Sequence, residues 1–319
     1  MRVLVIGGTG FVGRHVLPLL VEEGHEVAAL HRGTMASSLP EGVHDIRGNR
    51  DRLADSRAAI ERFAPDVVLD LVLYTERQAR EVANTFRGTG TRVVGVSSGD
   101  VYRNYDGFRG KATAPPDPVP LSEESPLREM RYPYRGHDTS FAYAQDYEKI
   151  LVEQVLMEDP ALPATVLRFP CVYGPGDRQH RLLPYLKPME QGESRIFVEE
   201  DQAGWRWTRG FVENVAAALA LVASNPRAAG QVYNVGDEPT FTELDWVKRI
   251  ARVAGWRGDV VAVPRAELPD NLQQPVDWSY DLWTDTTALR SEVGYVPPVP
   301  LDEALKRTVE WERVELDGN

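Results

Sequence analysis

Residues 3–13 constrain the fold more than any other part of the chain. They read VLVIGGTGFVG, four apolar residues followed by glycines at positions 7, 8, 10 and 13. Glycine is required where a turn takes positive φ values and where the backbone approaches a pyrophosphate closely. The segment predicts a buried strand, a tight turn and a helix whose free N–H groups face an anion. We therefore expect a dinucleotide to bind at this end of the chain.

Short apolar runs alternate with helical patterns along most of the chain. The apolar runs occupy residues 3–6, 27–30, 67–73, 93–96, 165–169 and 232–235. The helical patterns occupy residues 11–23, 78–86, 147–157 and 211–223, with a last one at 301–314. Strands that alternate with helices predict an α/β fold with a doubly wound parallel sheet of the Rossmann type, covered by helices on both faces.

The order of these patterns predicts two structural units. We expect a Rossmann dinucleotide-binding domain formed by residues 1–170 and 209–238, and a smaller C-terminal substrate-binding lobe formed by residues 171–208 and 239–319. Residues 103–141 interrupt the alternation with six prolines. This segment is too long for a routine connection, and two interpretations stay open, a lid over the site and a surface insertion.

Composition excludes several classes of function. The 319 residues carry a net charge of −12 without a basic run, which disfavours binding to nucleic acid. No apolar run approaches the roughly 18 residues of a membrane-spanning helix. Six histidines and one cysteine, Cys171, show no metal-ligand spacing, so we expect no metal. The lone cysteine also excludes an internal disulfide, and we expect a cytoplasmic protein.

Five motifs follow one another along the chain. They are GGTGFVG at 7–13, VSSGDVYR at 96–103, YEKILVE at 147–153, RFPCVYGPGDR at 168–178, and TRGFVENV at 208–215 paired with VYNVGDEP at 232–239. Together they resemble the extended short-chain dehydrogenase/reductase superfamily, in its NAD-dependent epimerase/dehydratase family. The resemblance implies an NAD(P)-dependent oxidoreductase or epimerase that moves a hydride at a carbinol or carbonyl carbon. It also implies a homodimer packed through the helices at 78–86 and 147–157.

The resemblance places a set of residues at the dinucleotide. They are Gly7, Thr9, Gly10, Phe11, Val12, Gly13, Leu71, Val72, Ser97, Lys149, Phe169, Pro170 and Val172. At the end of the second strand, where an acidic residue normally binds the ribose, this chain has His31 and Arg32. An arginine suits the 2′-phosphate of NADP, so we favour NADP over NAD. The alternative is NAD bound through Asn49 and Arg50.

Ser98 is the expected hydroxyl donor to the substrate carbonyl. It stands three residues before Val101, the position that the resemblance gives to this donor. Sugar 4,6-dehydratases carry Thr-Asp-Glu where this chain has Ser98, Gly99 and Asp100. The missing acid at position 99 argues against that dehydration.

The catalytic helix departs from the YxxxK pattern of the family. Lys149 fits the lysine, which places Gln145 at the tyrosine position. An amide cannot exchange the proton that a phenol of lowered pKa exchanges with a substrate hydroxyl. Tyr143 and Tyr147 are candidate replacements, although a regular helix would turn Tyr147 about 200° away from Lys149. Three hypotheses stay open: Tyr143 acts, Tyr147 acts through a distorted helix start, or the acid/base is absent.

The substrate is expected to contact Tyr102 and three arginines, Arg178, Arg206 and Arg209. Arg209 precedes Phe211 as in sugar-nucleotide epimerases, where the equivalent arginine binds a phosphate, so its presence favours an anionic or nucleotide-sugar substrate. The competing function is that of a non-catalytic NAD(P)-binding sensor or regulatory protein, and Gln145 supports it.

Overall fold

A computed structural model describes residues 1–33, 39–112, 114–137 and 139–317 of the chain. Its centre is a parallel sheet of seven strands in the order β10-β6-β5-β4-β1-β2-β3. The strands are β1 (Arg2–Ile6), β2 (Glu26–His31), β3 (Val43–Arg47), β4 (Val67–Asp70), β5 (Arg92–Ser98), β6 (Ala164–Phe169) and β10 (Val232–Asn234). The order reverses between β1 and β4, which confirms the predicted doubly wound Rossmann architecture.

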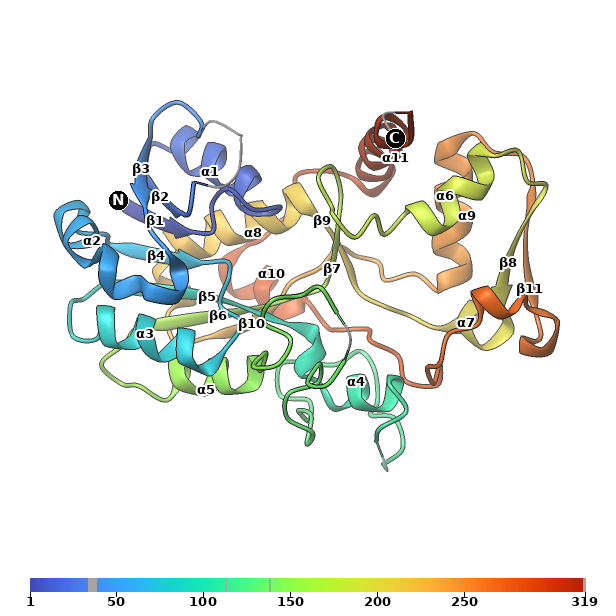
Figure 1. Ribbon diagram of the computed structural model, residues 1–319, viewed down its shortest axis with the longest axis horizontal. Coiled ribbons are helices and arrows are strands. Elements are labelled where there is room, and N and C mark those ends of the chain that lie inside the picture. The colour runs from blue at the N-terminus through green and yellow to red at the C-terminus, as the bar shows by residue number, and fades with distance from the viewer. Residues whose placement is uncertain (34–38, 113, 138, 318–319) are drawn as a thin grey trace.

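Helices cover both faces of this sheet (Figure 1). One face carries α1 (Gly13–Glu22) and α8 (Val212–Ser224), and the other carries α3 (Glu76–Phe86) and α5 (Lys149–Met157). Strand β1 shows why two layers form. Val3 and Val5 pack toward α1 and α8, whereas Leu4 and Ile6 pack toward α3 and α5, because successive side chains of a strand point to opposite faces. The helix α2 (Arg57–Phe63) follows a 3₁₀ helix at Arg50–Ser56 beside this layer.

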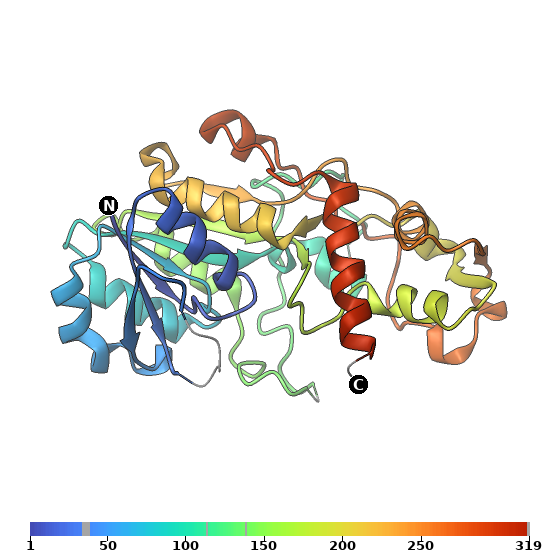
Figure 2. The ribbon, with the colours of Figure 1, turned by 90° about the horizontal axis from the view of Figure 1, so that it is seen from above.

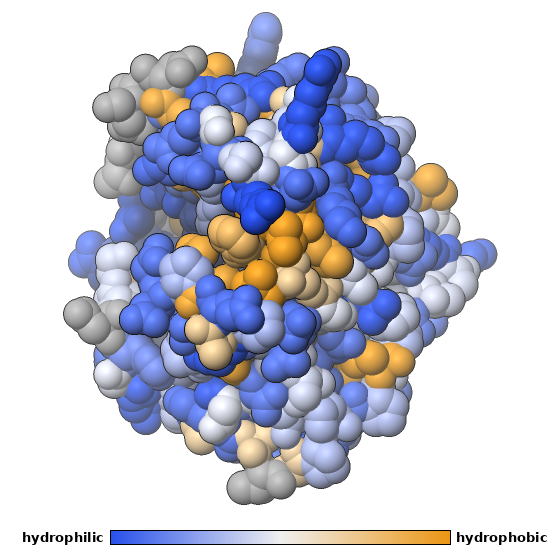
Figure 3. Space-filling view, turned by 90° about the vertical axis from the view of Figure 1, so that its right-hand side faces the viewer, coloured by the Kyte–Doolittle hydropathy of each residue, from blue (hydrophilic) through white to orange (hydrophobic). Residues whose placement is uncertain are grey.

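The C-terminal lobe lies to the right in Figure 1. Its two-stranded parallel sheet pairs β8 with β11; the helices α6, α7 and α9 pack against that sheet, and α11 packs against α9. The elements are β8 (Arg195–Glu199), β11 (Asp259–Val263), α6 (Leu183–Glu190), α7 (Glu200–Gly204), α9 (Glu243–Ala254) and α11 (Leu301–Asp317). Figure 3 looks at this end of the molecule and shows one apolar patch ringed by hydrophilic residues. Phe197 of β8 is one of the exposed apolar side chains of the lobe.

A parallel ribbon links the two units. It pairs β7 (Cys171–Tyr173) with β9 (Arg209–Phe211), so each strand stands where the chain passes between sheet and lobe. The helix α10 (Thr287–Val293) departs from the expected division, because it packs against β10 of the large sheet rather than within the lobe (Figure 2).

Residues 103–141, as far as the structure describes them, pack tightly against the rest of the molecule. They begin with α4 (Arg103–Phe108). Leu121 donates a backbone hydrogen bond of 2.7 Å to the carbonyl of Trp283. The side chain of Arg128 is fully buried and pairs with Glu148 at 3.1 Å. These contacts favour the interpretation as an insertion over that as a lid.

Candidate functional site

The turn between β1 and α1 has the shape that a pyrophosphate requires. Gly7 has a φ of +85°, and the N–H of Gly10 donates to its carbonyl at 2.9 Å. A Cβ at Gly13 would lie 2.5 Å from the oxygen of Gly7, so no other residue fits there. No side chain caps the start of α1, and the positive end of a helix dipole favours an anion there. Thr9, Phe11 and Val12 complete this half-buried turn. The residues present therefore fit a dinucleotide.

The expected adenosine end lacks an acidic residue on β2. His31 ends that strand and pairs through Nε2 with Asp45 of β3 at 3.0 Å, while Arg32 is exposed. Asn49 accepts a hydrogen bond from the N–H of Asp51, which caps the 3₁₀ helix that follows.

Arg50 does not face this region of the surface. Its buried guanidinium lies 2.7 Å from the carboxylate of Asp70, and it also donates to the carbonyl of Gln78 at 2.8 Å. The pair with Asp70 sits inside the protein at the end of β4, so the geometry gives Arg50 an internal partner instead of the adenine contact considered from the sequence.

Lys149 lies at the expected nicotinamide end, at the first position of α5. Its side chain is buried, and Nζ donates hydrogen bonds of 2.7 Å to the carbonyls of Leu73 and Val96. Burial lowers the pKa of Lys149 to about 8, although Asp100 and Asp70 nearby partly oppose that shift. The carbonyls come from the ends of β4 and β5, where the sheet places its ligand-binding edge.

The side chain of Tyr147 also lies near Lys149, although Tyr147 stands two residues before the start of α5. Its hydroxyl donates to Asp100 at 2.7 Å, Ser98 lies near it, and the centroid of its ring lies 5.8 Å from Nζ of Lys149. Tyr147 forms an antiparallel bridge with Thr75, so its backbone is extended and not helical. The rotation of about 200° that a regular helix would impose therefore does not apply.

Gln145 and Tyr143 occupy different surroundings. Gln145 is exposed in a turn, and its side-chain oxygen accepts from the N–H of Gly136. The face that Gln145 was expected to share with Lys149 does not exist, because α5 begins only at Lys149. Tyr143 donates its hydroxyl to Asp51 at 2.9 Å, away from Ser98.

Asp100 is the centre of a tyrosine cluster that sequence reasoning missed. Tyr134 donates to its carboxylate at 3.2 Å, and the hydroxyl of Tyr105 lies 2.8 Å from that of Tyr134. Burial raises the pKa of Asp100, against the opposing charge of Arg128. Burial and the charge of Asp100 raise the pKa of Tyr147. No local spacing signals this cluster, since its members come from three separate segments.

Two further residues lie elsewhere than predicted. Ser97 is buried and donates to Glu153 at 2.5 Å, because it points to the face of β5 opposite Ser98. Tyr102 was expected at the substrate, but it is fully buried and donates to Asn234 at 2.6 Å. Leu71, Val72, Phe169 and Pro170 are half-buried beside the turn and the strand ends, and Val172 is buried.

The expected substrate arginines differ in their surroundings. Arg209 forms an ion pair with Glu243 in which both side chains are largely buried. Arg206 lies over the ring of Trp283 at 5.7 Å, and Arg178 is on the surface. Trp205 packs against Phe108 with stacked rings 5.0 Å apart, which places it in the core rather than at a ligand.

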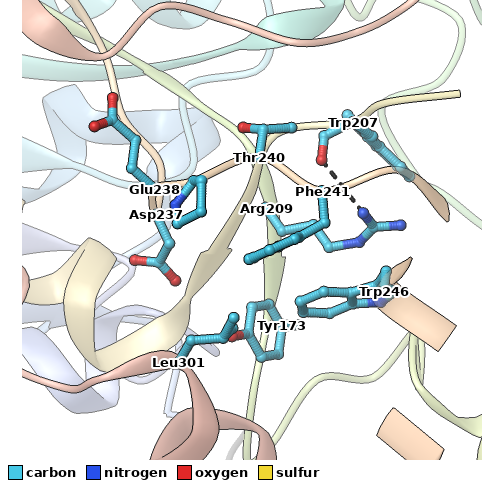
Figure 4. Close-up of a pocket in the computed structure, with 10 residues that line it drawn as sticks. Tyr173, Trp207, Arg209, Asp237, Glu238, Thr240, Phe241, Trp246 and Leu301 are labelled. Carbon is cyan, nitrogen blue, oxygen red and sulfur yellow. Dashed lines mark hydrogen bonds between the residues drawn. The ribbon is translucent and has the colours of Figure 1, made fainter. Parts of the chain in front are cut away.

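A pocket in front of β7 and β9 contains Arg209 (Figure 4). Aromatic rings and carboxylates line it together, and the figure shows Arg209 extended between Trp207 and Trp246. The lining residues are Tyr173, Trp207, Arg209, Asp237, Glu238, Pro239, Thr240, Phe241, Trp246 and Leu301.

The model of the NAD-dependent epimerase/dehydratase family matches residues 3–236, well over half of the chain. The chain belongs to this family. The resemblance inferred from the motifs is thereby confirmed. Among its relatives is the 2-alkyl-3-oxoalkanoate reductase of Stenotrophomonas maltophilia, 26% identical over 96% of this chain and 98% of that protein. A probable dTDP-glucose 4,6-dehydratase of Sinorhizobium fredii is 25% identical over 98% of this chain and 92% of its own.

Solved structures share the fold of this chain. The UDP-glucose 4-epimerase of Thermus thermophilus, solved with NAD, superposes with a TM-score of 0.69 at 22% identity and covers 98% of this chain and 99% of its own. Members of the family bind a nicotinamide dinucleotide, which the glycine turn of this chain fits. In the parts of the chain that the structure describes, no helix is long and apolar enough to cross a membrane. Within those parts no cluster of three metal-ligating side chains occurs.

Proposed function

We propose that this protein is an NAD(P)-dependent oxidoreductase or epimerase in which Tyr147 is the acid/base. The observation that carries the proposal is the position of the Tyr147 hydroxyl, which meets Ser98 and Asp100 beside the buried ammonium of Lys149. The register of YxxxK is lost, but a phenol, a serine hydroxyl and a lysine still gather at the carboxyl edge of the sheet.

A bound nicotinamide supplies or accepts the hydride at a carbinol or carbonyl carbon. Ser98 donates to the reacting oxygen, and Tyr147 exchanges the proton with it. In the direction of oxidation, the substrate hydroxyl passes its proton to the oxygen of Tyr147 while Tyr147 passes its own to Asp100. The raised pKa of Tyr147 disfavours a free phenolate, whereas the raised pKa of Asp100 makes its carboxylate a better acceptor. The two transfers are therefore coupled.

Replacement of Tyr147 by phenylalanine tests this assignment. We expect turnover to fall by about 10²- to 10⁴-fold, the usual contribution of a general acid or base. The assay follows oxidation of NADH and NADPH across a panel of ketones and sugar nucleotides, and fluorescence titration follows cofactor binding, which should not change. Tyr143→Phe and Gln145→Ala are the controls and should keep most of the activity. Full activity in Tyr147→Phe would disprove the assignment.

One observation favours the second candidate, a non-catalytic cofactor sensor. Tyr147 is only 6% exposed, and the ring of Tyr134 packs against it with centroids 4.9 Å apart. A sensor binds the cofactor but turns over no compound of the panel. The same cofactor titration and turnover screen therefore separate the two functions.

The cofactor and the assembly are parts of the same proposal. We favour NADP because β2 ends without an acidic residue and Arg32 is exposed there. The structures solved with NAD are similar in fold only, so they do not decide the choice for this chain. A homodimer through α3 and α5 and a cytoplasmic location remain predictions that light scattering and fractionation can test.

A further inference from the structure

Arg209, which lines the pocket of Figure 4, is already paired with one of the protein's own carboxylates. Glu243, at the first turn of α9, pairs with the guanidinium of Arg209, and only 5% and 11% of the two side chains are exposed. Tyr185 donates to the other oxygen of Glu243 at 2.6 Å. Trp246 lies under the guanidinium, 4.4 Å from Cζ to the ring centroid. Arg209 is thus neutralised and held from two sides.

The remaining charges around the pocket do not restore a positive potential. Asp237 and Glu238 both line it, and Glu238 is balanced by Arg290 at 3.6 Å. Since the negative charge of Glu243 neutralises the positive charge of Arg209, the negative charge of Asp237 is not balanced. Burial raises the pKa of Asp237 to about 6, so it is mostly ionised at neutral pH. A bound phosphate would meet net negative charge here.

The size of the pocket also disfavours a bound phosphate. The pocket opens to solvent, and within it about 20 Å³ is available to the centres of water-sized molecules, which is room for about one water. The walls are otherwise the rings of Trp207, Phe241 and Trp246. A diphosphate would have to displace Glu243 from Arg209 and leave a carboxylate buried without its counter-charge, which is strongly unfavourable.

Strand pairing relates Arg209 to the strand end that carries Ser98. Ser98 lies opposite Phe169 in the pairing of β5 with β6, and Cys171, two residues further, lies opposite Arg209 in the pairing of β7 with β9. Two strand separations and one two-residue step give a path of roughly 16 Å along the backbone. A substrate whose carbonyl lies at Ser98 would reach Arg209 only if it extended over about that distance.

We propose that Glu243 closes this subsite to phosphate and makes the substrate a compact carbonyl or carbinol compound that is uncharged or cationic. The inference rests on the proposed function, since it concerns the substrate of that same site. It replaces the expectation that Arg209 selects a nucleotide sugar. Glu243 is a specificity-determining residue that acts through Arg209.

Calorimetric titration with UDP and UDP-glucose tests the inference without any turnover. For the natural protein we expect no binding below about 1 mM, and for Glu243→Gln a gain of at least tenfold because Arg209 regains its charge. Glu238→Gln is the matched control, since it removes a carboxylate that lines the pocket but leaves Arg209 paired, and it should gain less than threefold. In the double variant Arg209→Gln/Glu243→Gln the gain should vanish.

Two outcomes would overturn the inference. One is micromolar binding of UDP-glucose to the natural protein, and the other is an equal gain in Glu238→Gln and Glu243→Gln. NADPH binding, measured for each variant, shows that the variant is folded; if Glu243→Gln does not fold, titration of the natural protein still decides. The proposed function would fail by a different result: the protein would bind the cofactor but turn over no carbonyl compound, independently of the result of the UDP titration.

Discussion

Glu148 has an extended backbone, with φ −157° and ψ 93°, and this single residue determines where the hydroxyl of Tyr147 lies. Its side chain accepts from the N–H of Ile150 and caps α5, so the helix begins at Lys149. The side chain of Tyr147 therefore projects from an extended backbone, as that of a strand residue does. The helix expected at 147–157 included Tyr147, because glutamate is not among the residues that usually cap a helix and so did not mark its start.

At β2 the choice of cofactor depends on Arg32. If its guanidinium binds a 2′-phosphate, Arg32→Ala should weaken NADPH binding by roughly tenfold to a hundredfold, the value of a charged hydrogen bond, and leave NADH binding within about twofold. Fluorescence titration of both cofactors measures this. Arg57→Ala, which removes an exposed arginine paired with Glu61, is the control. Tighter binding of NADH than NADPH by the natural protein would contradict the preference.

Asp237 makes stability depend on pH. It accepts hydrogen bonds from the N–H of Phe211 at 2.7 Å and from Asn214 at 2.8 Å, and burial raises its pKa from 3.8 to about 6. Between these values the folded protein holds a proton that the unfolded chain has released, so stability falls as the pH rises.

Relative to Asp237→Asn, the natural protein should therefore lose up to about 3 kcal/mol of unfolding free energy between about pH 4 and about pH 7. Urea unfolding at several pH values measures the difference. The variant loses one acceptor at every pH, so only the pH-dependent part bears on the prediction. A constant difference would show that Asp237 titrates normally.

At the scale of elements, the turn before α1 tolerates no side chain at Gly13. A Cβ there would lie 2.6 Å from Cα of Gly8 as well as 2.5 Å from the oxygen of Gly7. We expect Gly13→Ala to destabilise the protein by about 1–3 kcal/mol and to abolish dinucleotide binding. Thermal unfolding and cofactor titration measure the two effects.

Gly204 offers a matched control on α7, because a Cβ there would have no neighbour within 4 Å and its φ is not positive. Gly204→Ala should change stability by less than about 1 kcal/mol. If the two alanine variants behaved alike, the tight approach at Gly13 would have no role.

The elements that sequence reasoning found are those with a buried face. The helix expected at 11–23 spans 13–22, and that expected at 211–223 spans 212–224. Thr242 caps α9 by accepting from the N–H of Asp245, and Gly255 ends it in the left-handed conformation. By contrast β3 was missed, because only Ile46 of its five residues is buried and no apolar run marks it.

The residues of the candidate site divide in a similar way, into those that a local motif marks and those that it does not. Ser98 and Lys149 could be found because each stands in a motif of fixed spacing. Asp100 with its tyrosines, and Glu243 on Arg209, could not be found, because these partners meet only after strands distant in sequence are paired. The hydrogen bond between Tyr134 and Asp100 spans 34 positions of the chain, and the ion pair of Arg209 also spans 34.

At the scale of the whole molecule, one hydrophobic core joins the sheet to the lobe. The same buried cluster contains Val3 and Val5 of β1, Val215 of α8, and Trp246 and Ile250 of α9. We expect calorimetry to show a single unfolding transition that cofactor moves as one peak to higher temperature. Two transitions, of which cofactor shifts only one, would show that the lobe unfolds alone.

Lys149 connects the stability of the fold with the preorganisation of the candidate site for its ligand. Its ammonium is dehydrated when the chain folds, and the carbonyls of Leu73 and Val96 stand in for the water it has lost. Hydroxyl groups of an arriving ribose would exchange one set of oxygen acceptors for another. Because the ammonium is already dehydrated in the folded protein, the cost of its desolvation lowers the stability of the fold and not the affinity for the ligand. The protein is therefore less stable to heat, but little has to rearrange when the ligand binds.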